Sequence, residues 1–185
     1  IKDAAGNSAT LTLPATSSSD SLAGNSALVI DTTPATVTEV TSTTAAGSYK
    51  AGDAVSVQAV FSEAVTVASG TPTLTLETGS TDRSVNYSSG SGGTTLTFAY
   101  TVQAGDTAAD LDYALNSSLA LAGATIRDAA SNNATLTLPT VGGSDSLAGN
   151  EALVIDTTPA TVTNVTSTKD CLLYTSDAAD ESSSV

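Results

Sequence analysis

Hydrophobic and polar residues alternate with a period of two in several short stretches of this chain. In residues Ala54–Phe61 every second side chain is apolar. This alternation predicts β-strands that bury one face, and the many Thr and Val residues favour the same structure. The apolar positions of these stretches are Val55, Val57, Ala59, Phe61, Leu74, Leu76, Leu96, Phe98, Tyr100, Val102, Leu136, Leu138, Leu153 and Ile155.

Clusters rich in Gly, Pro, Ser and Asn separate these stretches and predict turns. They lie at Gly47–Ser48, Ala51–Asp53, Ser69–Pro72, Ser89–Gly93 and Ala129–Asn133. Helical spacing is confined to one short run, residues 107–111, which is compatible with a single turn. Seven or more short strands joined by turns predict an all-β fold, an immunoglobulin-like Greek-key β-sandwich.

Tyr113 follows the acidic run Asp110-Leu111-Asp112. A tyrosine after an acidic turn resembles the tyrosine corner of immunoglobulin-like sandwiches, in which the hydroxyl bonds back to the main chain. An ordinary half-buried strand tyrosine explains the pattern equally well, and both interpretations stay open at the level of sequence.

The same sequence is written twice in this chain. Residues 1–43 and 126–168 align without a gap at an offset of 125 and differ at nine of 43 positions. A long period of this kind indicates a tandem array. Each copy contains the motif Val-Ile-Asp-Thr-Thr-Pro, whose proline stops strand pairing. We therefore expect residues 1–33 to end one repeat, 34–158 to form a complete repeat and 159–168 to begin the next.

The repetition ends abruptly after Thr168. Residues 171–181 read CLLYTSDAADE, which a common transposase sequencing adapter encodes in one reading frame. We interpret residues 169–185 as a non-native tail and exclude them from the argument about the fold. The alternative is a divergent natural terminus. Without the tail the chain contains no cysteine.

Composition excludes several classes of function. The chain has no His, Trp or Met, so a Ser-His-Asp triad or a Cys/His zinc site is excluded within it. Its 19 acidic and five basic residues give a net charge of −14, which disfavours nucleic acid and anionic membranes as partners. A glycosidase carboxylate pair is a poor fit to a repeated, Trp-free unit, and we expect no enzymatic activity.

With the strands, linkers and repeat established, the chain resembles the bacterial immunoglobulin-like and cadherin-like tandem repeats of large, biofilm-associated surface adhesins. The resemblance covers residues 1–168 and implies export, display at the cell surface, and a role in adhesion or biofilm formation. It also implies calcium near the domain junctions. It rests on the motifs Phe61–Val67, Gly70–Leu76, Tyr100–Asp106, Asp110–Tyr113, Ile126–Ala130 and Val154–Pro159.

Acidic residues in three regions are candidate calcium ligands, because calcium is bound by carboxylate, carbonyl and amide oxygens. Asp106, Asp110 and Asp112 lie within seven residues of one another. Asp128 lies in a turn with Asn132 and Asn133 nearby, and Asp156 and its twin Asp31 lie in the linkers. The resemblance adds Glu63, because cadherin-like folds place an acidic ligand there. The predicted ligands are Glu63, Asp106, Asp110, Asp112, Asp128 and Asp156.

A second interpretation of these acidic residues stays open. Asp and Asn are common in turns because their side chains bond to the neighbouring main chain. Asp128 would then shape a hairpin, and Asp156 would only cap the linker.

We expect a structural function from this sequence. The repeats would form an extended spacer that contacts its neighbouring repeats and is stiffened by calcium. The alternative is a module that binds a host or matrix glycan or protein through loops such as residues 88–93. A third class is a secreted enzyme whose catalytic domain lies outside these residues. The chain starts in mid-repeat at Ile1 and contains no signal peptide or membrane-spanning run, so we expect the export signal and any anchor to lie outside it.

The repeat also raises a hypothesis about assembly. Residues 1–33 carry nearly the same strands as residues 126–158 but lack a sandwich of their own. We therefore expect the two segments to compete for one place in the fold, within one chain or between chains.

Overall fold

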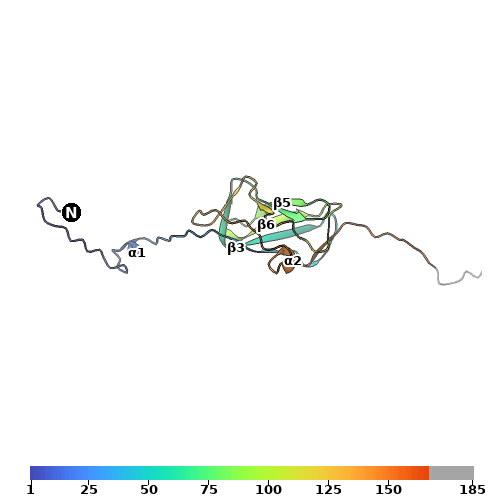
Figure 1. The fold of residues 1–185 in the computed structure, drawn as a ribbon, viewed down its shortest axis with the longest axis horizontal. Helices are drawn as coiled ribbons and strands as arrows, with labels where there is room; N and C mark the ends of the chain where they lie inside the picture. Colours follow the sequence, from blue (N-terminus) through green and yellow to red (C-terminus); the bar gives the residue numbers. More distant parts are fainter. Residues whose placement is uncertain (167–185) are drawn as a thin grey trace, which may run out of the picture.

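In the computed structural model, which describes residues 1–166, one folded domain lies between two extended segments (Figure 1). The domain covers about residues 35–158. Residues 1–33, the N-terminal arm, leave it at one end, and residues 159–166 leave it at the opposite end. Within residues 1–166, no helix has the length and apolar character needed to span a membrane.

The domain is mostly β, as predicted. Its large sheet is antiparallel and curls into a half-barrel. The strand order is β1 (Val37–Ser42), β3 (Ala54–Ala68), β6 (Gly93–Thr101), β5 (Arg83–Ser89), β4 (Thr73–Glu77) and β8 (Asp112–Tyr113), while β9 (Leu119–Ala120) pairs with β4 and β10 (Thr125–Arg127) pairs with β3.

A smaller mixed sheet completes the domain. Its central strand is β11 (Leu153–Asp156), which pairs in parallel with β2 (Gly47–Tyr49) and antiparallel with β7 (Thr107–Ala108). The strand β11 therefore joins the last part of the domain to two segments far from it in sequence.

The longest strand, β3, connects the two ends of the domain. Its first half pairs with β1 and β6, and its second half pairs with β10. The pairing register with β6 shifts between Val60 and Val65. Such an irregularity bends a strand and re-aims its side chains, and Glu63 lies within it.

A single core fills the space that the sheets enclose. The predicted alternation is confirmed in β3, β4, β6 and β11, where the apolar positions are buried and their neighbours are not. The largest fully buried side chains include Tyr100, Tyr113, Phe98, Leu74, Leu76, Leu96, Leu147, Leu153 and Ile155.

Two local predictions were wrong. Residues 107–111 form no helical turn, because Thr107 and Ala108 pair with β11. There tertiary pairing overrides the local pattern. The stretch that contains Leu136 and Leu138 keeps the predicted alternation, since Leu138 is buried and Leu136 packs against the core. It forms no continuous strand, however, and an isolated bridge joins Thr135 to Thr36.

The helical turns lie instead in the repeated sequence Ser-Leu-Ala-Gly-Asn. They are α1 (Leu22–Asn25) and α2 (Leu147–Asn150). In each, the serine before the helix accepts a hydrogen bond from the main-chain N–H of the glycine three residues later. A serine cap of this kind satisfies an N–H that a helix start leaves free.

Tyr113 is fully buried, and its hydroxyl donates to the carbonyl oxygen of Pro139 at 2.7 Å. The hydroxyl therefore bonds to the main chain, as in a tyrosine corner, but to a residue 26 positions downstream. The loop containing Pro139 is held nearby because Gly142 N–H donates to Asp112 Oδ2 at 2.9 Å.

Candidate metal centre

Three carboxylates meet at the end of the domain where the N-terminal arm enters. They belong to Asp31 in the arm, Glu63 in β3 and Asp128 just after β10, and a ligand oxygen from each lies within 4.8 Å of the others. Asp128 is buried, and the other two are half-buried. Residues from three distant parts of the sequence therefore form one acidic cluster, which we call the junction triad.

The turn after β10 holds the Asp128 carboxylate in place. Its Oδ1 accepts a hydrogen bond from Asn132 N–H at 2.9 Å, and its Oδ2 accepts one from Asn132 Nδ2 at 2.8 Å. Asn132 Nδ2 also donates to the carbonyl oxygen of Asp31 at 3.2 Å. The same asparagine thus fixes the Asp128 side chain and ties the arm to the domain.

Glu63 reaches the triad because of the irregularity in β3. Regular pairing with β6 stops at Val60 and resumes at Val65, so Glu63 is free of a regular ladder position. Burial raises the pKa of Glu63, and the negative charges of Asp31 and Asp128 raise it further. Ionisation of Glu63 is therefore less favourable here than in water, and a nearby positive charge would offset this effect.

The pKa of Asp128 moves in the opposite direction. Burial raises it, but hydrogen bonds from the Asn132 side chain and from the N–H groups of the turn lower it more, to a net value below 3.8. The turn thus favours the ionised form of Asp128, whereas the surroundings of Glu63 oppose its ionisation. A bound cation would relieve this conflict.

The donor set of the triad fits calcium. Calcium–oxygen distances are about 2.3–2.6 Å, so two oxygens that share one ion are at most about 5.2 Å apart. The triad's ligand atoms lie within 4.8 Å of one another and so meet that limit. All three donors are hard carboxylate oxygens, and the chain contains no histidine. Softer transition metals prefer nitrogen and sulfur ligands instead.

Asp106, another predicted ligand, is committed to an ion pair. Its Oδ1 lies 2.7 Å from Arg83 Nη2, and its Oδ2 accepts hydrogen bonds from the Tyr100 hydroxyl at 2.7 Å and from Gln103 N–H at 2.9 Å. The side chain is 1% exposed. Asp106 therefore organises the interior of the domain and lies outside the triad.

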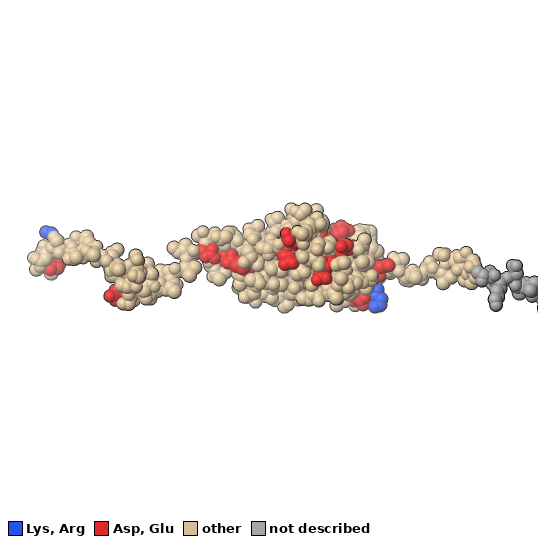
Figure 2. Space-filling view, turned by 90° about the horizontal axis from the view of Figure 1, so that it is seen from below, with Lys and Arg blue, Asp and Glu red and all other residues tan. Residues whose placement is uncertain are grey.

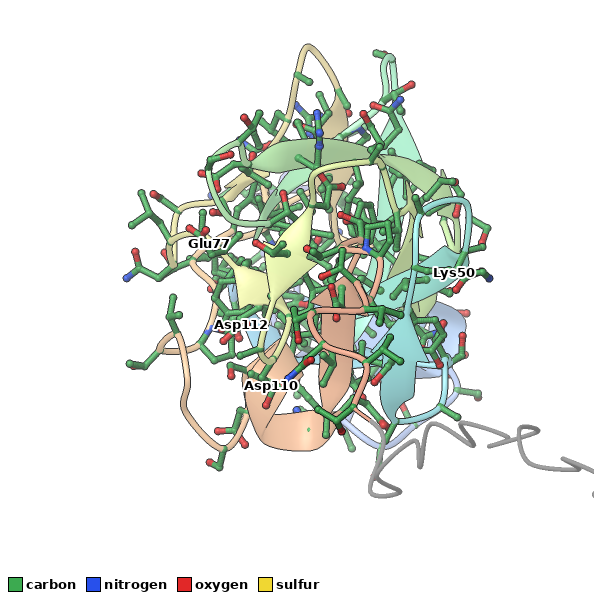
Figure 3. The ribbon with its side chains drawn as sticks, turned by 90° about the vertical axis from the view of Figure 1, so that its right-hand side faces the viewer. Lys50, Glu77, Asp110 and Asp112 are labelled. Carbon is green, nitrogen blue, oxygen red and sulfur yellow. The ribbon has the colours of Figure 1, made fainter. Side chains whose placement is uncertain are left out.

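Asp110 and Asp112 lie at the opposite end of the domain. Figure 3 shows both near Glu77 at the end from which the C-terminal segment leaves. Asp110 Oδ1 accepts from Leu153 N–H at 3.2 Å, and Asp112 accepts from the N–H groups of Tyr113 and Gly142, both at 2.9 Å. Each carboxylate thus stabilises the local main chain by accepting hydrogen bonds from nearby N–H groups.

Asp156 ends β11 and begins the linker. Its Oδ1 accepts from Thr158 N–H at 2.9 Å, as Asp31 Oδ1 does from Thr33 N–H at 3.0 Å. Among residues 1–166, the junction triad is the only group of three acidic side chains close enough to share an ion. Glu63 and Asp128 are brought together in it, whereas Asp106, Asp110, Asp112 and Asp156 are not.

Asp31 is the triad member that was considered only as the twin of Asp156. The signal that identifies it is its position, because it precedes the folded domain by a few residues. A linker carboxylate thus faces the domain that follows it. Sequence alone does not indicate on which side of the linker its partners lie.

Both ends of the domain carry negative charge. Figure 2 shows acidic side chains where the arm enters and again toward the opposite end, with few basic ones on this face. The Lys50 Nζ forms an ion pair with Asp53 Oδ1 at 3.1 Å. Two such ends brought together would repel each other without a counter-ion.

Comparisons with models of known families, with curated proteins and with solved structures found no match to this chain.

Proposed function

We propose that this chain is part of a tandem array of immunoglobulin-like repeats in an exported bacterial surface adhesin. The array acts as an extended spacer in adhesion or biofilm formation, and calcium at each junction stiffens it. The observation that carries this proposal is the junction triad, which joins a linker aspartate to two acidic side chains of the following domain. The curled sheet, the small mixed sheet and their shared core support the immunoglobulin-like class.

The repeat extends the triad to every junction. Asp156 occupies the same place in its copy as Asp31, and Thr-Thr-Pro-Ala-Thr-Val-Thr follows both. In an array, Asp156 would face the next repeat's counterparts of Glu63 and Asp128. The triad geometry and the sequence period together then give one site per boundary.

The mechanism is electrostatic. Without an ion, the carboxylate of Asp31 is repelled by Glu63 and Asp128, and the linker pivots. A calcium ion held by all three carboxylates would fix the angle between linker and domain. The Asp31 carbonyl, water and a rotated Asn132 amide could complete the six to eight oxygen ligands that calcium takes. The acidic far end of the preceding repeat would add negative charge at the junction and so strengthen the attraction for a cation.

The alternative, a binding module that uses residues 88–93, lacks comparable support. Within the described chain, every Phe and Tyr side chain is buried or half-buried. Tyr87 packs edge-on against Phe98, with ring centroids 6.3 Å apart, and its hydroxyl accepts from Ser91 N–H at 2.9 Å. The aromatic ring nearest this loop therefore supports the domain rather than offering a flat platform for a sugar.

We expect calcium to raise the thermal midpoint, Tm, of the chain measured first in EDTA. A ligand at 100 times its Kd stabilises the folded state by about 2.7 kcal/mol. For a domain of this size each kcal/mol moves Tm by about 3–6 °C, so the rise is roughly 8–16 °C. Circular dichroism melting curves across millimolar calcium, with magnesium as the comparison ion, measure it.

Matched variants separate the triad from the other predicted ligands. Glu63→Gln and Asp128→Asn should abolish the calcium response, and Glu63→Gln should slightly raise Tm in EDTA because it removes repulsion. The pair Asp110→Asn/Asp112→Asn should keep the response. The opposite pattern would place calcium at the far end of the domain, and no response in the unaltered chain would sink the calcium proposal.

Stiffening is tested separately by small-angle X-ray scattering on a chain with two complete repeats. We expect calcium to lengthen the particle and narrow its distribution of distances, because a fixed linker keeps the repeats in line. Glu63→Gln in the second repeat should give the EDTA profile even in calcium. An unchanged profile would mean that the linker is stiff, or flexible, regardless of the ion.

A further inference from the structure

The N-terminal arm and residues 126–158 are close copies that lie in opposite environments. They match at 25 of 33 positions. Residues 126–158 supply seven buried side chains to the domain, and the arm carries the identical residue at each corresponding position. The seven are Ile126, Asp128, Leu138, Ser146, Leu147, Leu153 and Ile155.

The differences between the copies avoid the core. All eight fall on positions that are exposed or half-exposed in the domain, so none changes a side chain that faces the interior. These positions are Arg127, Ser131, Asn133, Thr140, Val141, Gly142, Gly143 and Glu151. At every position that is buried in residues 126–158, the arm therefore carries the same side chain.

The arm's core-type side chains have no core in this structure. Leu22 is 72% exposed whereas its twin Leu147 is 0% exposed, and Ile30 is 91% exposed whereas Ile155 is 2% exposed. The local structure of the arm is nevertheless formed, since α1 repeats α2 with the same serine cap. Covering these side chains would be favourable, because burying a Leu or Ile is worth about 1.5–3 kcal/mol.

We propose that the arm of one chain takes the place of residues 126–158 in the domain of a second chain. The partner is thus another copy of this protein, and the surface is the groove between β2, β7 and β3 that residues 126–158 normally fill. By the register of β11, Val29 of the donor lies beside Ser48 of the acceptor, and Ile30 lies beside Tyr49 and Ala108. This inference does not depend on calcium or on the spacer function.

The arm cannot fill this groove in its own domain. The arm enters at one end of the domain, whereas β11 leads out at the opposite end (Figure 1). If the arm took the place of β11, its residue Thr33 would lie at that far end of the domain. Pro34 alone would then have to span the domain to reach Ala35, which lies just before β1 at the other end. One residue covers only about 3.5 Å, so the acceptor must be a different chain.

The resulting contact is head-to-tail. The donor's domain would follow the acceptor's domain as one repeat follows another in the array, and the same contact could be repeated by the next chain. Such heterologous contacts do not close on themselves and give open chains. Molecules of this chain could therefore be joined end to end through an exchanged segment.

Residues 126–158 of the acceptor compete with the donor's arm, and this competition sets the fraction of domains that hold an arm from another molecule. A tethered segment has an effective concentration of about 1 mM. An arm from another molecule should then fill roughly 1% of grooves at 10 μM protein and roughly 10% at 100 μM. Exchange requires the native segment to leave, so the two species should be refolded together from urea to reach this balance.

Disulfide trapping on the full chain tests the proposal. One chain carries Val29→Cys and the other carries Ser48→Cys, both with Cys171→Ser, and they are refolded together under oxidising conditions. Cα atoms of paired neighbouring strands lie within disulfide range. We expect the mixed disulfide, quantified by mass spectrometry, to rise about tenfold between 10 and 100 μM. The control pair, Ala5→Cys with Ser48→Cys, should show only collisional background.

Two further variants make the outcome decisive. Leu147→Asp/Leu153→Asp in the Ser48→Cys chain disables its own segment, and the trapped fraction at 10 μM should rise at least tenfold. Adding Leu22→Asp to the Val29→Cys chain should return it to background. A trapped fraction equal to the Ala5→Cys control, or one that Leu22→Asp leaves unchanged, would overturn the proposal.

Discussion

Replacing Asp106 by alanine is expected to lower the free energy of unfolding by about 3–5 kcal/mol. The carboxylate is buried, forms the ion pair with Arg83 and accepts the Tyr100 hydroxyl and the Gln103 N–H. Its removal leaves the half-buried guanidinium of Arg83 and the buried hydroxyl of Tyr100 without their acceptor. Breaking a buried pair by deleting one partner is costly because the remaining charge is uncompensated.

Urea unfolding followed by circular dichroism measures this loss. Asp82→Ala is the matched control, because Asp82 lies next to Arg83 in sequence but is exposed. It should change stability by less than about 0.5 kcal/mol. Adding Arg83→Met to Asp106→Ala should recover part of the loss. Equal effects of the two alanine variants would show that net charge, not the buried pair, is responsible.

The ion pair of Asp106 with Arg83 also makes the free energy of unfolding depend on pH. Burial raises the pKa of Asp106, but hydrogen bonds from Arg83, Gln103 and Tyr100 lower it by more than burial raises it. The net pKa therefore lies below 3.8. A carboxyl with a depressed folded-state pKa stabilises fully above its unfolded pKa and loses this contribution as the pH falls through the folded value. The difference between the parent and Asp106→Ala should therefore be constant near neutral pH and shrink below about pH 4.

Leu147→Ala should cost about 2–5 kcal/mol, whereas Leu22→Ala should cost almost nothing. The two leucines occupy the same position of α2 and α1, in the same sequence Ser-Leu-Ala-Gly-Asn. Leu147 is fully buried and Leu22 is largely exposed. Only the first substitution removes buried apolar volume and leaves a cavity.

This comparison isolates tertiary packing from local sequence. Helix propensity and capping change equally in both variants, so the difference in their urea midpoints at equal slope reports burial alone. A similar loss in both variants would mean that the arm is packed in solution. In that case the losses should depend on protein concentration, as the exchange between chains requires.

Much of the β-structure was predictable from alternation. Val55, Val57, Ala59 and Phe61 were expected on one face of a strand, and all four are buried in β3. The pattern was reliable there because the strand has one face on the core and one face toward solvent. The sheet order and the irregularity at Glu63 were not predictable, since they depend on which strands meet.

The failures share one cause. Residues 107–111 look helical in isolation, yet Thr107 and Ala108 pair with a strand that lies about 50 residues later in the chain. Asp106 looked like one member of an acidic cluster with Asp110 and Asp112. Arg83, 23 residues away, takes its carboxylate instead. Partners so distant in sequence leave no trace in local spacing.

The candidate metal centre was only partly predictable. Glu63 and Asp128 were among the expected ligands, but their association with Asp31 depends on how β3, β10 and the linker converge. Asp128 could be chosen because it lies in a predicted turn with Asn132 and Asn133 nearby. Nothing in the sequence indicates that this turn lies beside the linker of the preceding repeat.

The repeat separates what the sequence determined from what only the tertiary structure decided. The turns of Asp3 with Asn7 and of Asp128 with Asn132 make the same hydrogen bonds. Both turns place their fourth residue, Gly6 or Ser131, at a positive φ of 87° or 73°. These features need partners only a few residues away, so the sequence forms them with or without a domain around them.

Strand β11 and the burial of its side chains behave differently. Leu153–Asp156 forms a strand because β2 and β7 offer free main-chain groups on both sides. The identical sequence at residues 28–31 has no such strand neighbours and forms no strand, and its Leu28, Val29 and Ile30 stay exposed. A strand's hydrogen bonds and a core's contacts come from distant segments, so the tertiary structure alone decided which copy became part of the domain.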